Sequence, residues 1–310
     1  MLTVSSPSAA NGSNKLRSRV EKRTRKHEER ILIARPERLI VHRDEPDPYP
    51  EGVVEANEDA CGVGTWVVRI KHTKLCQYID SAYGAARKWP GGWVYIDLFC
   101  GPGRIRMVGE SNTRPGGAVA AWRQSQISGT PFSKVLIGDL NEKKLADCER
   151  RLQLVGAPVK AFNLAAVDSV KAMVREVPRG ALCLAYVDPY KIGVLAFDIF
   201  RILAEHDVDI VVNFFTSDLR RNVDTARDEL NPGWRMRLAG QMNKSSLAAA
   251  WFEDWQQQVK GLGFRMAKSM QTVENSKNSE LYRLVFFAKK DFPLGLWEDN
   301  TANPTGDLFD

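Results

Sequence analysis

Two short segments of this sequence combine residue types that can bind a ligand and act on it. In DLFCGPGR (97–104), Asp97 supplies a hydrogen-bond acceptor, and Gly101 and Gly103 let the backbone turn tightly and approach a ligand. In YVDPYKIG (186–193), an apolar segment ends on a carboxylate, a rigid ring and an aromatic face. Either segment could instead be structural, since glycine turns serve packing and Asp-Pro commonly stops a strand.

The glycine loop predicts the kind of cofactor. A dinucleotide site would show G-x-G-x-x-G at the start of a helix, and only the first two glycines of that pattern are present. The acid-x-x-x-Gly-x-Gly order instead resembles the loop that cradles S-adenosylmethionine.

Asp139, at the end of VLIGD, stands where Rossmann-like folds place a carboxylate for ribose hydroxyls, although it could instead cap the following helix. The predicted cofactor-binding residues are Asp97, Phe99, Gly101, Pro102, Gly103 and Asp139. Gly103 and Asp139 are 36 residues apart, against about 20 in the usual unit. The excess falls in a polar loop at 105–116, which could be a lid, a substrate loop or an obstacle to the cofactor.

The second segment resembles the Asp/Asn-Pro-Pro-aromatic motif of amino-methyltransferases, with one proline missing. There the acid accepts hydrogen bonds from a target NH2 group, and the ring stacks on a flipped base. Asp188, Pro189 and Tyr190 are therefore the predicted catalytic residues. Asn213, at the end of DIVVNF, either projects into the same crevice or ties down a loop.

Strands and helices alternate along the chain, which predicts right-handed crossovers and a parallel sheet. Strands are expected at 93–98, 134–140, 159–163, 181–187 and 209–215, with helices at 72–89, 117–124, 141–154, 169–177 and 195–204. A polar helical stretch (223–260) and two closing strands, within 263–273 and 280–290, follow. The fold class is α/β, with a doubly wound, mostly parallel, seven-stranded Rossmann-like sheet of class I methyltransferase type.

Charge divides the chain into two expected parts. Lys15–Arg43 holds eleven Lys or Arg and four Glu, whereas the rest of the chain is close to neutral. We expect residues 1–52 to be a basic, partly disordered arm and linker, and 53–310 to be the Rossmann-like domain. The arm could bind nucleic-acid phosphates or simply be a solvated leader.

The sequence gives no support for a metal-binding, secreted or membrane-spanning protein. The five cysteines and four histidines are scattered, so no metal site is expected. No segment has the length and apolarity of a signal peptide or a membrane helix, so a cytoplasmic protein is expected.

The order of the motifs resembles the three-Cys-motif partner (TcmP) family between Lys71 and Trp297. The matching segments are HTKL, YIDLFCGPGR, RPGGA, YVDPYKIG, DIVVNF and ELYRLVFFAKKDFPLGLW. The resemblance implies a methyltransferase-like fold and a radical-SAM-like partner that carries the three cysteines. His72 and Lys74 open the family's leading helix without an assigned role. Cys100, in place of a small Ala, and Arg-Pro-Gly-Gly, in place of a Gly-Ser-Pro-like turn, depart from the pattern.

The leading hypothesis is a SAM-dependent methyltransferase, or a relative of one, that acts on nucleic acid. A non-catalytic module that binds nucleic acid or a partner on the same fold is the alternative. A metal-dependent nuclease using Asp97, Asp139 and Asp188 ranks third, because such a role would leave the glycines without a purpose.

Overall fold

The computed structural model describes residues 38–43, 45–56, 67–106, 111–240, 243–274 and 280–302. The N-terminal arm up to residue 37 lies outside these ranges, so its predicted character remains a prediction. The boundary expected at residue 53 falls inside the compact unit that spans Pro36–Asp310. Leu39, Ile40 and Val41, around the short 3₁₀ turn η2 (Ile40–His42), are buried and pack against the domain, so apolar burial begins before the predicted boundary.

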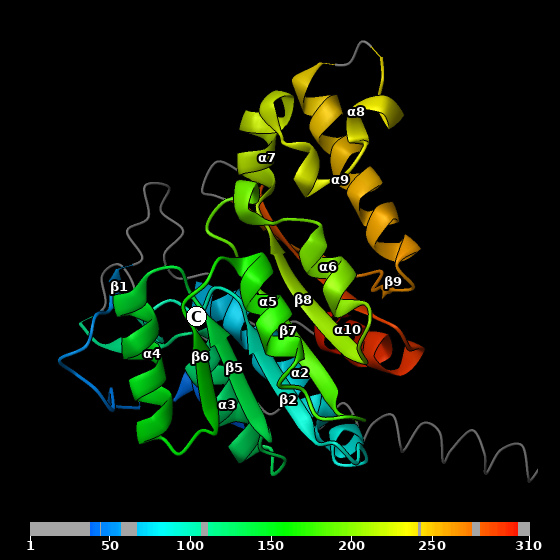
Figure 1. Ribbon diagram of the computed structural model, residues 1–310. Helices are drawn as coiled ribbons and strands as arrows, with labels where there is room; N and C mark the ends of the chain where they lie inside the picture. The colour runs from blue at the N-terminus through cyan, green and yellow to red at the C-terminus, as the bar shows by residue number, and fades with distance from the viewer. Residues whose placement is uncertain are drawn as a thin grey trace, which may run out of the picture. The chain divides into compact units, whose positions relative to one another are not determined.

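A mixed sheet of eight strands forms the centre of the domain (Figure 1). Its order is β6 (Val159–Phe162), β5 (Lys134–Gly138), β2 (Trp93–Asp97), β7 (Leu182–Val187), β8 (Val208–Phe214), β11 (Glu280–Ala288) and β10 (Gln271–Glu274), with β9 (Arg265–Met266) also on β11. The strands from β6 to β8 are parallel, and β11 is antiparallel to β8. Successive strands are added on one side of β2 as far as β6 and then, from β7 onward, on its other side, and this reversal of strand order between β2 and β7 confirms the doubly wound sheet of class I methyltransferase type.

The sheet has eight strands rather than the predicted seven, because the first closing strand is interrupted. Met266 pairs with Phe287 and Gln271 pairs with Leu284, so five steps along one chain face three along β11. Two extra residues must bulge out between the pairs, and they divide the strand into β9 and β10. The apolar pattern of 263–273 gives no sign of this bulge.

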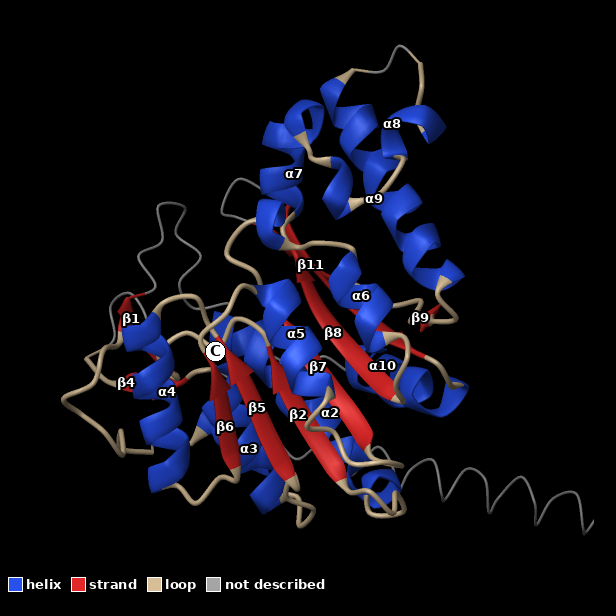
Figure 2. Ribbon diagram, viewed as in Figure 1, coloured by secondary structure: helices blue, strands red, loops and turns tan. Residues whose placement is uncertain are grey.

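Helices cover both faces of the sheet, as Figure 2 shows. One face carries α2 (Thr73–Ala86), α3 (Gly117–Ile127), α4 (Glu142–Leu154) and α10 (Asp291–Ala302). The other carries α5 (Ala166–Val174), α6 (Asp198–Leu203), α7 (Thr216–Asn222) and α9 (Lys244–Gly261). Strand side chains alternate between the two cores: in β2, Val94 and Ile96 join one cluster, and Trp93 and Tyr95 join the other. The carboxyl ends of the strands therefore stay open between two packed layers.

The loop expected at 105–116 is partly a β-hairpin. β3 (Arg104–Arg106) pairs antiparallel with β4 (Thr113–Pro115), and β1 (Glu55–Ala56) adds a parallel third strand. The hairpin ends before α3, so most of the extra length is ordered beside the glycine loop. Residues 107–110 lie outside the described ranges, and the lid and substrate-loop roles stay untested.

The stretch expected to be helical at 223–260 is broken into several pieces. It contains the 3₁₀ turns η5 (Val223–Thr225) and η6 (Asp228–Leu230), the short α8 (Trp234–Arg237) and most of α9. Pro232, followed by Gly233 with a φ of 73°, prevents a continuous helix. Together with α7 these pieces form a lobe at the top of Figure 1. Within the described ranges, no helix is both long and apolar enough to cross a membrane.

Candidate functional site

A cavity of about 1090 Å³ lies at the carboxyl ends of the parallel strands. Small-molecule sites range over about 300–1000 Å³, so this cavity can hold a cofactor and part of a second molecule. All nine residues predicted from the sequence line it: Asp97, Phe99, Gly101, Pro102, Gly103, Asp139, Asp188, Pro189 and Tyr190. The structure therefore brings both predicted motifs to one place, and their roles there remain predictions.

Asp97 ends β2 and shapes the glycine loop. It is buried, and its carboxyl group accepts hydrogen bonds from the Phe99 amide (3.1 Å) and the Tyr95 hydroxyl (3.1 Å). Burial raises the pKa of Asp97 to about 7, although both hydrogen bonds oppose that shift. The residue holds the start of the loop more than it presents a charge to solvent.

The glycine loop passes through backbone conformations that favour glycine. Gly101 and Gly103 have φ values of 57° and 76°. A Cβ on Gly103 would lie 3.0 Å from Cys148 Sγ and 3.1 Å from Val119. The loop is thus packed against α3 and α4. Its residues line the cavity, and the Glu55 carboxylate lies 2.9 Å from where a Cβ on Gly101 would stand.

A fully buried arginine supports the loop from below. Arg151 of α4 donates through both forks to Asp47, at 2.9 and 2.8 Å, and also to the carbonyl oxygens of Val53, Tyr49 and Pro102, at 2.8, 3.0 and 2.7 Å. All five N–H donors of the guanidinium have partners. The segment 47–53 and the glycine loop are therefore tied to a single side chain.

Asp139 lines the cavity and does not itself cap α4, which was the alternative role considered for it. Its oxygens accept from the amides of Gly101 (3.0 Å) and Asn141 (2.8 Å), while the cap of α4 is the Asn141 side chain. Asp139 is half-buried, so its remaining lone pairs can reach a ligand. Leu140 and Leu164, on the adjoining strand ends, are 73% and 43% exposed and line the cavity. Exposed apolar side chains beside an acceptor suit the ring of a nucleoside.

Asp188 is engaged by three neighbouring side chains. Lys71 Nζ lies 2.8 and 2.6 Å from its two oxygens, Asn213 Nδ2 donates to Oδ1 at 2.8 Å, and the Tyr186 hydroxyl donates to Oδ2 at 3.1 Å. Burial alone would raise the pKa of Asp188, but the Lys71 ammonium and the other donors hold it below its ordinary value. Asp188 is therefore an ionised acceptor at neutral pH.

Tyr190 and Pro189 complete the predicted motif. Tyr190 is 70% exposed with its ring at the cavity, whereas Pro189 is buried. A large exposed ring next to an ionised acceptor is the arrangement that stacking on a planar base requires. The motif contains a stacking surface and an acceptor despite its missing proline.

Sequence reasoning missed Tyr186 and Lys71. Tyr95 and Asp97 are two residues apart in β2, and Tyr186 in β7 is two residues before Asp188, which directly follows that strand. This spacing brings the two side chains of each pair together and gives a detectable Tyr-x-Asp signal. The two copies lie on paired strands, with Asp97 opposite Tyr186. Lys71 comes from η3 (Val67–His72), a short π-helix that leads into α2, and no sequence pattern places it near Asp188.

His72 and Lys74, whose roles the sequence left open, differ in position. His72 is buried and lines the cavity, its Nδ1 has no hydrogen-bond partner, and burial together with Lys71 lowers its pKa to about 4. Lys74 Nζ instead donates to the Asn300 carbonyl at 2.6 Å, which ties α2 to α10. His72 is thus a neutral side chain at the site, and Lys74 is structural.

Nothing in the described ranges supports the nuclease hypothesis. No three His, Cys, Asp or Glu side chains in them converge as a metal site would require. The oxygens of Asp139 and Asp188 are directed by amide, ammonium and hydroxyl donors instead.

Comparisons with known proteins reach only the level of fold. No protein-family profile and no curated sequence matches the chain. Among solved structures it is similar to a DUF519-family protein from Legionella pneumophila, with 11% identity over 78% of this chain and 94% of that one and a TM-score of 0.48. It is also similar to a SAM-dependent methyltransferase from Anabaena variabilis, with 12% identity over 75% of this chain and 87% of that one and a TM-score of 0.37. A third similar structure is the ribosomal protein L11 methylase from Lactobacillus delbrueckii, with 12% identity over 70% of this chain and 78% of that one and a TM-score of 0.35.

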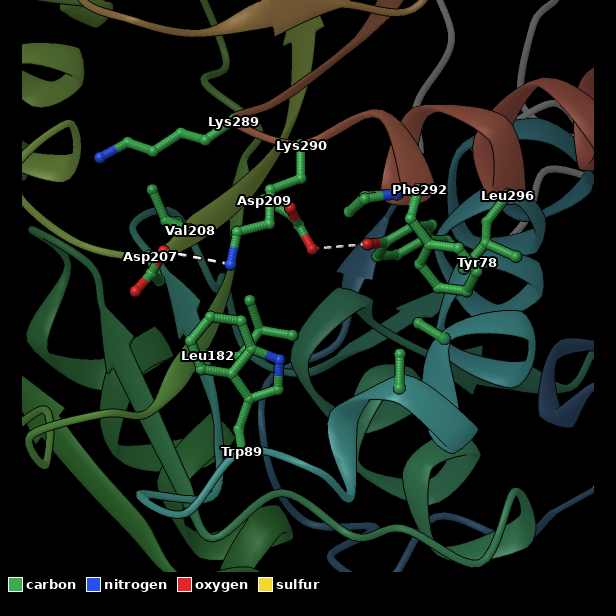
Figure 3. Close-up of a pocket in the computed structure, with 13 residues that line it drawn as sticks. Tyr78, Trp89, Leu182, Asp207, Val208, Asp209, Lys289, Lys290, Phe292 and Leu296 are labelled. Carbon is green, nitrogen blue, oxygen red and sulfur yellow. Dashed lines mark hydrogen bonds and ion pairs between the residues drawn. The ribbon is translucent and has the colours of Figure 1, made fainter.

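A second, smaller cavity of about 90 Å³ lies where β7 and β8 begin, away from the strand ends that carry the site (Figure 3). Tyr78, Trp89 and Phe292 line it together with Asp209, whose carboxyl group accepts from the Tyr78 hydroxyl at 2.6 Å. Burial raises the pKa of Asp209 to about 7, while the Tyr78 hydrogen bond opposes the shift. The ionisation of this buried carboxyl group should therefore change the stability of the fold near neutral pH.

The raised pKa of Asp209 predicts that the free energy of unfolding falls as the pH rises. Because its folded pKa exceeds the unfolded value, its contribution is present below about pH 4 and is lost as the pH rises through about 7. Between pH 5 and 7 the wild type should lose up to about 1.4 kcal/mol per pH unit relative to Asp209→Asn. Denaturant unfolding at each pH measures this, with Asp168→Asn at an exposed position on α5 as control. Equal slopes for wild type and Asp209→Asn would contradict it.

Proposed function

We propose that this protein is an S-adenosylmethionine-dependent methyltransferase, or a close relative, whose acceptor is an amino group of nucleic acid. One observation carries the proposal: the glycine loop with Asp139 and the Asp188-Pro189-Tyr190 motif line a single cavity. S-adenosylmethionine, when bound, supplies an electrophilic methyl group on a sulfonium and needs no metal.

The residues present fit that cofactor. Gly101 and Gly103 line the cavity and add no side chain to it, and Asp139 has lone pairs left for two vicinal hydroxyls. Leu140 and Leu164 offer apolar surfaces on either side of a purine ring. Together these features suit a nucleoside-containing ligand.

The second motif fits a planar amine. Asp188 and Asn213 would orient the nitrogen, and Tyr190 would stack on the ring that bears it. Holding the acceptor nitrogen and the methyl group in line is the main contribution such a site can make. Asp188 accepts from the amine and keeps the lone pair directed toward the methyl group.

Thermal unfolding with S-adenosylmethionine and S-adenosylhomocysteine tests the cofactor site. At 100 times its Kd, a ligand specific for the folded state adds about 2.7 kcal/mol, which is a shift of several degrees. Asp139→Ala should abolish most of the shift, because it removes the hydroxyl acceptor and frees the Gly101 amide. Glu253→Ala, an exposed acid on α9, should leave it intact. No shift in the wild type at millimolar ligand would refute the proposal.

The nucleic acid is proposed to bind through the basic arm, Lys15–Arg43. Binding of single-stranded RNA and DNA oligonucleotides should weaken steeply with salt, with a log–log slope near −0.7 per phosphate contact. Replacing six arm Lys and Arg residues by Gln should flatten that slope by several units. An unchanged slope would mean that the phosphate contacts are made by the domain and not by the arm.

A second function, a non-catalytic binding module, is favoured by one observation. The acceptor positions of the Asp188 carboxylate are already occupied by donors of the chain itself. Transfer of labelled methyl groups to nucleic acid, lost in Asp188→Ala, would decide for catalysis. From the resemblance to TcmP proteins we also propose a radical-SAM-like partner, which co-purification from the native host would test. We propose a cytoplasmic location because the five cysteines are scattered and suit a reducing compartment.

A further inference from the structure

The Asp188 carboxylate has no acceptor position left for a substrate. Oδ1 accepts from Lys71 and Asn213, each at 2.8 Å, and Oδ2 accepts from Lys71 at 2.6 Å and Tyr186 at 3.1 Å. A carboxylate offers about four lone-pair sites in all. A target nitrogen can reach Asp188 only if one of these donors leaves.

Lys71 is the donor that can leave. Tyr186 and Asn213 are 1% exposed and belong to β7 and β8 in the middle of the sheet. Lys71, which is 8% exposed, extends instead from the short π-helix η3 on a long side chain with several rotatable bonds, and it lines the cavity. Moving Lys71 requires a change of side-chain rotamers, whereas moving either of the others would disturb a buried strand.

Lys71 also resembles the expected ligand chemically. Its Nζ is a primary amine in its protonated form, and it donates to both oxygens of the acid that the site would use to hold an amine. The geometry points to Lys71 as a displaceable occupant of an amine subsite formed by Asp188, Asn213 and Tyr186. In the free protein Lys71 fills this subsite, and a substrate amine takes its place. That the displacing ligand is a methyl acceptor rests on the proposed function; the subsite itself does not.

Shortening Lys71 should open the subsite to a small amine. In Lys71→Ala, n-propylammonium should restore thermal stability in a saturable manner, with Tm rising by at least about 2 °C. Tetramethylammonium has the same charge but no N–H donors, so it should have no such effect. The double variant Lys71→Ala/Asp188→Asn should lose the rescue.

A surface lysine pair provides the matched control. Lys160 and Glu176 form an exposed pair at 2.7 Å, so Lys160→Ala should show no saturable response to n-propylammonium. Equal responses of Lys71→Ala to both ammonium ions, or of both Lys→Ala variants to n-propylammonium, would mean a general salt effect and overturn the proposal.

The wild type gives a second measurement that does not depend on the variant folding. Reductive methylation with formaldehyde and cyanoborohydride, followed by peptide mass spectrometry, should modify Lys71 at least tenfold more slowly than Lys160. Comparable rates would show that Lys71 does not occupy the subsite. Absence of an S-adenosylmethionine shift would refute the methyltransferase alone, whereas a shift without n-propylammonium rescue would refute the amine subsite alone.

Discussion

Replacing Arg151 with Met should destabilise the fold by about 3–5 kcal/mol, because it leaves the Asp47 carboxylate without its cation in a largely buried position. The guanidinium is fully buried and its side chain has no exposed surface, so solvent does not screen the pair. Three backbone carbonyl oxygens, those of Tyr49, Val53 and Pro102, lose a donor at the same time. Denaturant-induced unfolding measures the change.

The same substitution should also weaken cofactor binding more than the loss of stability explains. Pro102 lies between Gly101 and Gly103, and its carbonyl is held by Arg151 at 2.7 Å. Without that bond the loop would no longer be fixed in the conformation that the cofactor requires. We expect at least a tenfold rise in the Kd for S-adenosylmethionine at a temperature where the variant is folded.

Two variants control for charge and for position. Arg151→Lys keeps the positive charge but loses the planar fork, so it should retain part of the stability and little of the loop restraint. Arg150→Met changes the exposed neighbour on α4 and should alter neither quantity by more than about 0.5 kcal/mol. A loss below about 1 kcal/mol for Arg151→Met would show that Asp47 finds other partners and would refute this role.

The residues at strand ends were predictable because simple rules position them. Apolar periodicity locates β2, β5 and β7, and the carboxyl ends of parallel strands share one edge of the sheet. It follows that Asp97, Asp139 and Asp188 must lie along that edge, whatever the helices do. The glycine loop is determined locally, by the residues that can adopt positive φ.

Contacts between distant, irregular segments were not predictable. Lys71 and Asp188 are separated by 117 positions, and Arg151 and Asp47 by 104. In each pair one partner comes from a segment without periodic pattern, so nothing local gives its place on the sheet. The proline-rich segment 44–52 was expected to be a linker, yet Asp47 and Tyr49 within it accept hydrogen bonds from the buried guanidinium of Arg151. One charged side chain in a helix thus makes a nearby segment part of the domain.

Breaking the Lys71–Asp188 pair from either side should cost about 3 kcal/mol. Lys71→Met leaves a carboxylate, and Asp188→Asn leaves an ammonium, each largely buried without its counter-charge. Their side chains are 10% and 16% exposed and line a cavity, so we expect the lower end of the range for buried pairs. Removing both charges in Lys71→Met/Asp188→Asn should cost less than either single change, because no unpaired charge remains.

A double-mutant cycle measured at several pH values separates this pair from its surroundings. Lys71 helps to hold the pKa of Asp188 below its ordinary value, so the stability from the pair is present above about pH 4 and is lost as the pH falls through the folded pKa. The coupling energy should therefore be several kcal/mol at pH 7 and should shrink toward pH 3. Additive effects at pH 7 would mean that water in the cavity already screens the two charges. In that case Lys71 would be free to leave the amine subsite at little cost, and its departure would not limit substrate binding. A large coupling would instead make the displacement of Lys71 an energetic barrier that only a ligand with its own donors to Asp188 could offset.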